Sequence, residues 1–250
     1  MDADGFTIVS RGGSAAKDQK KKKKSTSRSQ SLPDPSLSAL QIVTHVRRLF
    51  GELKSSAWTS ECVAVIAESR ENSGGRARIR CRGVGCVGRS EVARLQCAFA
   101  LVLHDRFGDG RETLPEFVEP MLNEEEKIAL KDLGFDLETR LKPEVGDLIY
   151  APHAPAGLYH NELLVRWNDD LLRHCVIVGN CFSNYWIRLP AGRAPLIARI
   201  EPCVIEKALP NNPDASTTFN DTAVHSFRFE IPLPTLLDSD KSHNDPEMRE

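Results

Sequence analysis

The chain has 250 residues, 40% of them hydrophobic, which is enough to bury one sizeable core, so we expect a single domain with flexible ends. Its formal net charge is −2, but residues 1–36 hold eight Lys or Arg and four Asp, a local charge of +4 on an otherwise acidic chain. This distribution does not suggest direct nucleic-acid binding. No apolar stretch approaches the roughly 18–20 residues that cross a bilayer, so a membrane protein is not expected either.

Seven cysteines are spread through the sequence, an odd number without any C-x-x-C pair. Several lie within apolar patterns, as expected for small buried hydrophobes in a reducing compartment. The N-terminus also lacks the apolar region of a signal peptide. We therefore expect a cytoplasmic protein. The run Lys20–Lys24 is a candidate signal for the nucleus as well, although a charge run that only solvates the chain explains it equally.

Composition divides the chain into three regions. Residues 1–36 are rich in Ser, Lys and Gly and predict a disordered basic tail. Residues 37–205 carry the periodic apolar patterns of an α/β domain. Residues 206–250 are polar and rich in Pro and Asn, so we expect a mostly disordered segment with one ordered patch near residues 218–229.

Apolar periodicity and capping residues predict the elements of the domain. The predicted helices are one that begins near Leu37, Glu61–Arg70, one that follows Ser90, Glu124–Leu133 and one that follows Pro155. The predicted strands are Arg76–Val84, Phe117–Val118, Phe135–Thr139, Leu148–Ala151, Val176–Gly179 and Leu196–Val204. Helices that alternate with short strands indicate an α/β fold, here a Rossmann-like, doubly wound, mainly parallel sheet with a helical N-terminal prefix.

The block from Glu144 to Tyr185 is the most informative part of the pattern. It has a short apolar strand, a polar hinge, an amphipathic helix and a second strand, which is a βαβ unit with parallel strands. Ligands of open parallel sheets bind beyond the carboxyl ends of the strands. Because His153, Asn180, Asn184 and Tyr185 follow such ends, we expect the functional site there.

The segment Gly83–Gly88 matches G-x-G-x-x-G between a predicted strand and a predicted helix, with glycine at 83, 85 and 88. Such a loop lets a phosphate or nucleoside approach the backbone and a helix N-terminus. Glu119, at the end of the next strand, takes the place of the acid that holds a ribose, although it lies further along the chain than the usual fingerprint requires. A nucleotide or S-adenosylmethionine is one interpretation. Glycines that only allow close packing are the other.

His153 lies between two prolines that stiffen its loop, so its imidazole is expected to be held in place as a base, a ligand or a structural group. Tyr159 and Asn161 begin the following helix and are candidates to line a pocket beside it. The spacing of His153 and His160 matches no common metal pattern, so no metal is expected. Cys86 is expected to be an inert thiol.

Four separate segments carry a resemblance to a known family. They read C-R-G-V-G at 81–85, Y-A-P-H-A-P at 150–155, L-Y-H-N-E-L at 158–163 and G-N-C-F-S-N-Y at 179–185. In this order they resemble the Sensitivity to Red Light Reduced family, the SRR1-like domain proteins. Ala154, His160 and Cys181 depart from the Cys, Asn and Ser of the family motifs, so a role for a thiol at position 154 is not carried over.

The resemblance implies an intracellular regulatory protein linked to the circadian clock and to haem biosynthesis, without an assigned reaction. The alternative is an active or relict S-adenosylmethionine-dependent methyltransferase-type enzyme. A scaffold that binds protein partners is a third interpretation. Direct haem binding is not expected, because the chain has no Cys-Pro dipeptide. The candidate ligand-binding residues are Gly83, Gly85, Gly88, Glu119, His153, Tyr159, Asn161, Asn180 and Tyr185.

Overall fold

The structure is a computed structural model that describes residues 36–71, 73, 75–108, 113–138, 142–188, 194–211, 217–230, 233 and 235–236. The helices in this part of the chain are α1 (Ala39–Lys54), α2 (Ala57–Ser69), α3 (Glu91–Phe107), α4 (Glu124–Asp132), α5 (Ala156–Val165), α6 (Asp169–Arg173), α7 (Phe182–Arg188), α8 (Pro195–Ile200) and the 3-10 helix η1 (Glu201–Cys203). The strands are β1 (Ile79–Arg82), β2 (Glu116–Val118), β3 (Leu148–Ala151), β4 (Val176–Asn180), β5 (Val204–Ala208) and β6 (Thr222–Phe227).

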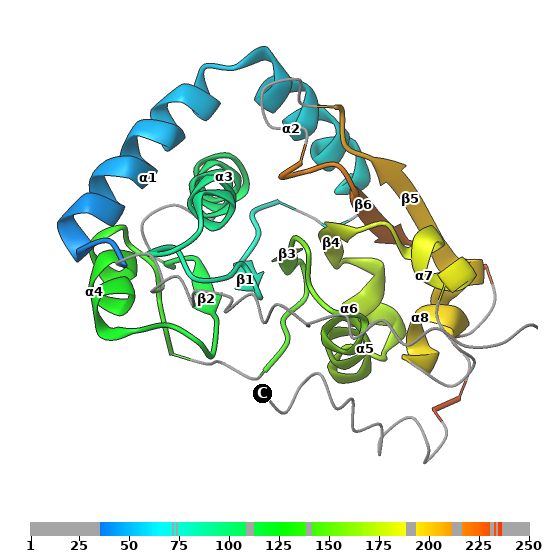
Figure 1. Cartoon of the computed structure of the whole chain (residues 1–250). Coiled ribbons are helices and arrows are strands. Elements are labelled where there is room, and N and C mark those ends of the chain that lie inside the picture. Colours follow the sequence, from blue (N-terminus) through cyan, green and yellow to red (C-terminus); the bar gives the residue numbers. More distant parts are fainter. Residues whose placement is uncertain are drawn as a thin grey trace, which may run out of the picture. The chain divides into compact units, whose positions relative to one another are not determined.

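The six strands form one sheet in the order β2-β1-β3-β4-β6-β5 (Figure 1). The first four are parallel to one another, and β6 runs antiparallel to both of its neighbours. The predicted α/β class with a mainly parallel sheet is therefore confirmed. The sheet also takes in residues beyond position 205, because β6 pairs with β4.

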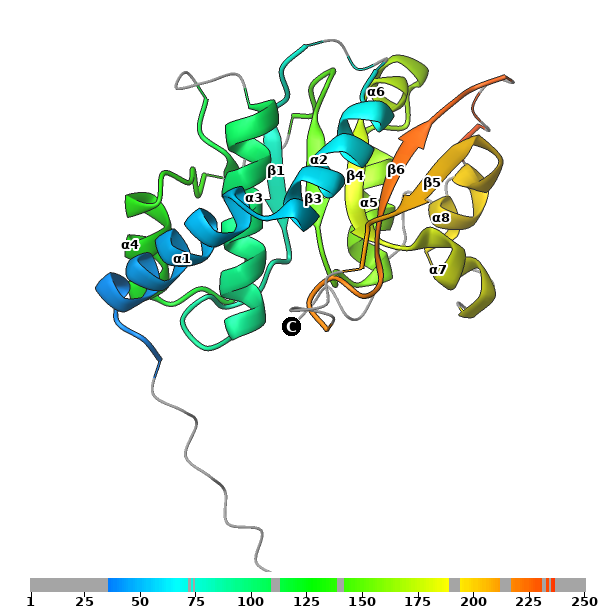
Figure 2. The same ribbon diagram turned by 90° about the horizontal axis from the view of Figure 1, so that it is seen from above.

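Alternate residues of the central strands enter two different cores. Leu148 and Tyr150 of β3 join a cluster formed with α1, α2 and α3, whereas Ile149 and Ala151 join a cluster formed with α5, α6 and α8. Figure 2 shows α1, α2 and α3 on one side of the strands and α5 behind them. Successive residues of a strand point to opposite faces of the sheet. Because helices cover both faces here, every residue of a central strand is buried, which explains the unbroken apolar runs of β3 and β4.

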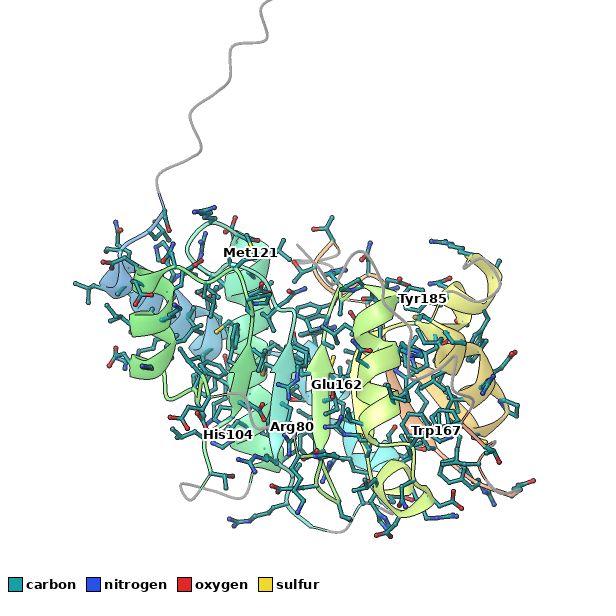
Figure 3. The ribbon with its side chains drawn as sticks, turned by 90° about the horizontal axis from the view of Figure 1, so that it is seen from below. Arg80, His104, Met121, Glu162, Trp167 and Tyr185 are labelled. Carbon is teal, nitrogen blue, oxygen red and sulfur yellow. The ribbon has the colours of Figure 1, made fainter. Side chains whose placement is uncertain are left out.

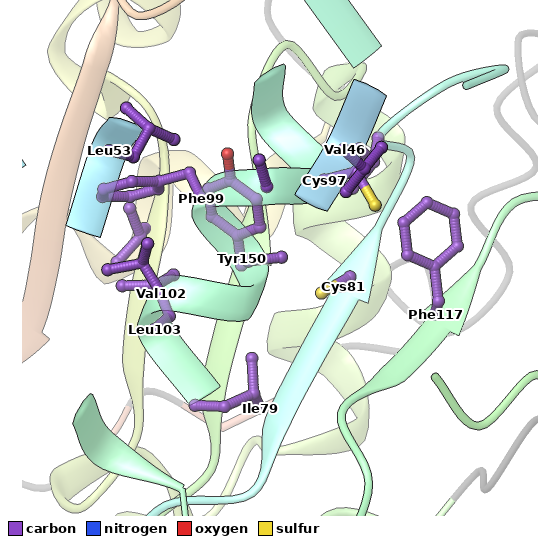
Figure 4. Close-up of a cluster of buried hydrophobic side chains, with 14 of the residues drawn as sticks. Val46, Leu53, Ile79, Cys81, Cys97, Phe99, Val102, Leu103, Phe117 and Tyr150 are labelled. Atoms are coloured by element: carbon purple, nitrogen blue, oxygen red, sulfur yellow. The ribbon is translucent and has the colours of Figure 1, made fainter. Parts of the chain in front are cut away.

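The first core is built around aromatic rings (Figure 4). Phe99 of α3 lies 5.3 Å from Trp58 and 5.8 Å from Tyr150 between ring centroids, and Phe219 approaches Trp58 at 4.9 Å. Burial of such side chains contributes about 1.5–3 kcal/mol each. This core therefore ties α2, α3 and the segment before β6 to the sheet.

Side-chain caps place the helix starts where the sequence predicts them. Ser90 accepts a hydrogen bond from Ala93 N and begins α3, and Asn123 forms a reciprocal capping box with Glu126 at the start of α4. Ser38 forms a second capping box with Gln41 at the start of α1. Each cap satisfies backbone N–H groups that otherwise lack partners in the first turn.

Several predicted boundaries are wrong. Residues 135–138, predicted as part of a strand, contribute only one isolated bridge, between Asp136 and Glu116. Leu196–Val204, also predicted as a strand, is the helix α8 followed by η1, because Pro195 begins a helical turn and short apolar runs do not separate the two states. The helix predicted at Glu61–Arg70 begins four residues earlier, and α7 was not predicted.

Some predictions lie outside the described residues. They are the basic tail with Lys20–Lys24 and the last part of the C-terminal segment, residues 237–250. Within the described part of the chain, no helix is both long and apolar enough to cross a membrane.

Candidate functional site

Because β1 to β4 are parallel, their carboxyl ends meet at one edge of the sheet, which we call the carboxyl edge. The glycine loop follows β1, Glu119 follows β2, His153 follows β3, and Asn180 ends β4. The structure thus brings together the strand ends on which the sequence prediction rests. It arranges them in two separate groups.

The first group is the glycine loop with two carboxylates. Gly85 N donates to Glu119 Oε2 at 3.0 Å, and Gly88 N donates to Glu126 Oε1 at 2.7 Å. Gly85 has a φ of +92°, which a side chain would strain. Backbone N–H groups that a phosphate would use are therefore already bonded to carboxylates, which also repel an anion.

The crevice beside this loop is closed. The strand order reverses between β1 and β3, and an open sheet holds its ligand at such a point. Here a Cβ placed on Gly83 would lie 3.4 Å from Leu158 Cδ1 and 3.7 Å from Ala154 Cβ. These are ordinary van der Waals contacts, so the loop and helix after β3 pack directly on the loop after β1.

The second group is centred on His153, whose backbone is in the left-handed region with a φ of +54°. A non-glycine residue keeps this conformation only when its surroundings hold it. His153 N donates to Asn180 Oδ1 at 2.7 Å, and His153 Nε2 lies 2.8 Å from the Thr218 carbonyl oxygen. Because a carbonyl oxygen only accepts, Nε2 of this exposed ring is the donor in the contact with Thr218.

Asn180 connects the other members of the second group to one another. Its Nδ2 donates to the Ala154 carbonyl oxygen at 3.2 Å and to the Tyr185 hydroxyl at 2.8 Å. Tyr185 in turn donates to the same Ala154 carbonyl at 3.0 Å. Together with the bond from His153 N, the amide of Asn180 uses both of its donor hydrogens and its oxygen inside the protein. The family motifs at 150–155 and 179–185 therefore form one rigid cluster.

Tyr159 is a fully buried member of this cluster. Its hydroxyl donates to the Ala151 carbonyl oxygen and accepts from Asn180 N at 2.7 Å. Burial raises the pKa of this hydroxyl well above its usual value. A side chain on Gly179 would overlap the Tyr159 ring, so this position requires glycine. The sequence predicts that Tyr159 lines a pocket beside His153; in the structure its side chain is fully buried between Ala151 and Asn180.

An ionic network supports the cluster from the sheet face that carries α5. Arg82 Nε lies 2.9 Å from Glu162 Oε1, and Arg82 Nη2 lies 3.0 Å from Glu116 Oε1. Arg80 bridges Glu116 and Asp147 at 2.9 and 2.8 Å. Figure 3 shows Arg80 and Glu162 on this face. The network holds α5, and with it the loop of His153, against β1.

A second polar contact, between Glu206 and His225, supports the other end of the cluster. Glu206 Oε2 lies 3.0 Å from His225 Nε2, and Glu206 accepts from Ser183 N at 3.1 Å and Ser183 Oγ at 2.6 Å. Burial opposes ionisation of Glu206, but the hydrogen bonds from His225 and Ser183 outweigh it and lower its pKa from 4.5 to about 2. This ionised carboxylate fixes the first turn of α7, which carries Tyr185.

Sequence reasoning found part of this arrangement. It missed Glu126, Thr218, Glu206 and His225, all of which hold the predicted residues in place. Thr218 and His225 lie within the ordered patch predicted near residues 218–229, and that patch was the available signal. Asn161, half-buried on α5, belongs to neither group.

The thiols fit the prediction of an inert set. All seven cysteines are free, and five are buried. Burial, followed by the charges of Glu126 and Glu119, raises the pKa of Cys86 in the glycine loop, which makes it less reactive.

Three cavities lie away from the candidate residues. The described residues line cavities of about 590, 610 and 880 Å³, and none of the nine candidate residues borders these three. The largest is bordered by Thr218, the acceptor for His153.

Comparison with known proteins assigns the class of protein. Residues 49–226 match the family described as the SRR1 domain, so the chain belongs to this family. The match covers the sheet, the glycine loop and the cluster of His153 and Asn180.

Among individual relatives, an SRR1-like protein of Drosophila melanogaster is 31% identical over 155 residues, which are 60% of this chain and 55% of the fly protein. An SRR1-like protein of Mus musculus is 24% identical over 76% of this chain and 77% of its own length. The protein SENSITIVITY TO RED LIGHT REDUCED 1 of Arabidopsis thaliana is 28% identical over 41% of this chain and 39% of its own length. The chain thus spans about half the length of the fly relative.

Proposed function

We propose that this chain is a regulatory protein that acts in circadian clock gene expression and haem biosynthesis through the carboxyl edge of a Rossmann-like, doubly wound domain. Membership of the SRR1 domain family supports this proposal, as does the name of the plant relative, which refers to red-light sensitivity. The covered faces of the sheet and the reversal of strand order between β1 and β3 support the Rossmann-like description.

The observation that carries the proposal is the cluster at this edge. Segments far apart in the sequence meet there, and their polar atoms bond to one another instead of facing solvent. The imidazole of His153 is the exception, because it is exposed and only its Nε2 is held, by the Thr218 carbonyl oxygen. We assign His153 as the residue that recognises a ligand or partner, and Asn180, Tyr159 and Tyr185 as the residues that hold its loop in place.

The test is complementation in cells depleted of the protein, with a clock-gene reporter and cellular haem content as readouts. His153→Ala is expected to lose both activities while its free energy of unfolding changes by less than about 1 kcal/mol. His153→Asn is the second variant, because Asn tolerates a positive φ and leaves the backbone in place. His45→Ala, at an exposed position of α1, is the matched control. A fully active His153→Ala chain overturns the proposal.

The same cells can be used to test where the protein is located in the cell. We assign the protein to the cytoplasm, with Lys20–Lys24 as the signal for a nuclear fraction. Replacement of these five lysines by Ser should remove that fraction in imaging of a tagged chain. An unchanged distribution means that the run only solvates the chain.

The alternative is a methyltransferase-type enzyme that binds S-adenosylmethionine. The contact of Glu119 with Gly85 favours it, since an acid beside a glycine loop suits a ribose. The closed crevice and the carboxylates on the glycine N–H groups do not fit the cofactor without movement of Ala154 and Leu158. Calorimetry with S-adenosylmethionine at millimolar concentration decides the matter: heat that Glu119→Gln abolishes supports this alternative, and no heat from the wild-type chain removes it.

A further inference from the structure

The largest described cavity is a groove that neither the cluster nor the glycine loop uses. It lies between the C-terminal half of α1, the start of α2 and the first turn of α3, and it measures about 880 Å³. Its apolar lining comes from all three helices. These residues are Leu49, Leu53, Ala57, Trp58, Val92 and Leu95.

The rim of the groove is acidic. Arg48 Nη1 pairs with Glu52 Oε1 at 2.6 Å, so these two charges offset each other. Glu61 of α2 and Glu91 of α3 also line the groove, and both are exposed. Neither has an ion-pair partner within the described part of the chain. The groove therefore combines an apolar floor with an excess of negative charge.

We infer that this groove docks a short segment of a partner protein in which an apolar side chain is flanked by Lys or Arg. The apolar side chain contacts Leu53 and Leu95, and the cationic groups face Glu61 and Glu91. Lys and Arg suit this rim because their aliphatic stems cover apolar surface while their charges remain at the edge. Charge complementarity of this kind selects the partner more than it adds affinity.

An open groove favours a peptide over a small molecule. Pockets for small ligands bury most of the ligand surface, whereas Glu61, Glu91 and Val92 are all exposed to solvent. The six residues of α1 from Arg48 to Leu53 span roughly 9 Å. The groove thus accommodates one or two turns of peptide, and an interface of this size is transient.

The groove is joined to the cluster by one residue. Thr218 lines the groove. Its carbonyl oxygen accepts hydrogen bonds from His153 Nε2 at 2.8 Å and from Gln96 Nε2 at 3.2 Å. A partner in the groove thus contacts the segment that holds His153. In this respect the inference rests on the proposed function and names the class of partner that the carboxyl edge serves.

The test is fluorescence anisotropy of the full chain with a labelled peptide of sequence GKKLLKKG. Glu61→Gln combined with Glu91→Gln should weaken binding about fivefold, as expected for two exposed ion pairs. Glu124→Gln combined with Glu138→Gln makes the same change of charge on α4 and just beyond it, and it should leave affinity within about twofold of wild type. The peptide GKKGGKKG should bind more weakly than the leucine peptide. Equal losses in both double variants, or equal affinity for the two peptides, overturn the inference, because they indicate general charge attraction.

Zero-length carboxyl–amine cross-linking followed by mass spectrometry locates the occupant. Coupling of the peptide to Glu61 or Glu91 is expected. Coupling of these carboxylates to Lys20–Lys24 of the same chain instead would assign the groove to the chain's own basic run and reject a partner. His153→Ala is tested in the complementation assay and the Glu61→Gln, Glu91→Gln double variant in the peptide assay, so a failure of the groove and a failure of the proposed function remain distinguishable.

Discussion

On the face of the sheet that packs against α1, α2 and α3, the strands from β2 to β6 contribute apolar side chains to one core. They are Phe117, Ile79, Cys81, Leu148, Tyr150, Val176, Val178 and Val224. On the opposite face, the charged pair of Arg80 and Glu116 is buried at one end of the sheet, and the half-buried Glu206 contacts the buried His225 at the other. Apolar contacts on that face run from β3 and β4 to Phe227 of β6.

This difference between the two faces indicates that they have different roles. Apolar burial is nondirectional, so the first face stabilises the sheet without specifying one arrangement closely. Buried ions contribute little net stability but require particular partners. On the second face these partners join β1 to α5 and β5 to α7, the two helices that carry Tyr159 and Tyr185. The ionic face therefore positions the cluster at the carboxyl edge.

The largest expected effect comes from breaking the ionic face. Arg80→Ala leaves Glu116 and Asp147 buried without this partner, which should lower the free energy of unfolding by about 3–5 kcal/mol. Ile79→Val, one residue away on the apolar face, should cost only about 0.5–1.5 kcal/mol. Urea unfolding of both variants measures the difference, and equal losses would contradict the division between the faces.

A smaller effect is expected at the β5–β6 end. Because the folded-state pKa of Glu206 is about 2, below its usual 4.5, its contribution is present above pH 4.5 and is lost as the pH falls toward 2. With allowance for screening by solvent, this loss should be about 1–2 kcal/mol. Glu206→Gln should flatten the acid limb of stability against pH in this window. An unchanged acid limb would show that the His225 contact does not hold the charge.

The smallest effect tests the apolar face. The Tyr150 hydroxyl is buried and has no hydrogen-bond partner in the described part of the chain. Tyr150→Phe removes this group and keeps the ring, so stability should stay the same or rise by up to about 1 kcal/mol. Thermal unfolding measures it, and a clear loss of stability would mean that an ordered water satisfies the hydroxyl.

The central strands were predictable from sequence because strands covered on both faces read as continuous apolar runs, as at Leu148–Ala151 and Val176–Gly179. The charged residues on the sheet face that packs against α5 were not predictable in this way. Arg80 and Arg82 alternate with Ile79 and Cys81, the pattern of a strand with one face in water. Their acceptors come from β2, from α5 and from the segment just before β3, and no local pattern reports a pairing between distant residues.

The candidate site was predictable in its place but not in its chemistry. Parallel strands put their ends at one edge, so His153 and Asn180 were expected near each other. Sequence alone did not show that the amide of Asn180 bonds only within the protein, because that depends on the left-handed backbone at His153 and on the carbonyl of Ala154.

The position of β6 has a consequence for how the protein is made. β6 lies between β4 and β5 but follows both in the chain, so a ribosome releases β4 and β5 before their shared neighbour exists. Until residues 222–227 emerge, the Val-Ile-Val core of β4 has an open edge, and apolar edges of this kind pair with other chains. Nascent chains should therefore depend on chaperones at this stage. Truncation before Thr222 should give aggregates instead of a smaller soluble domain.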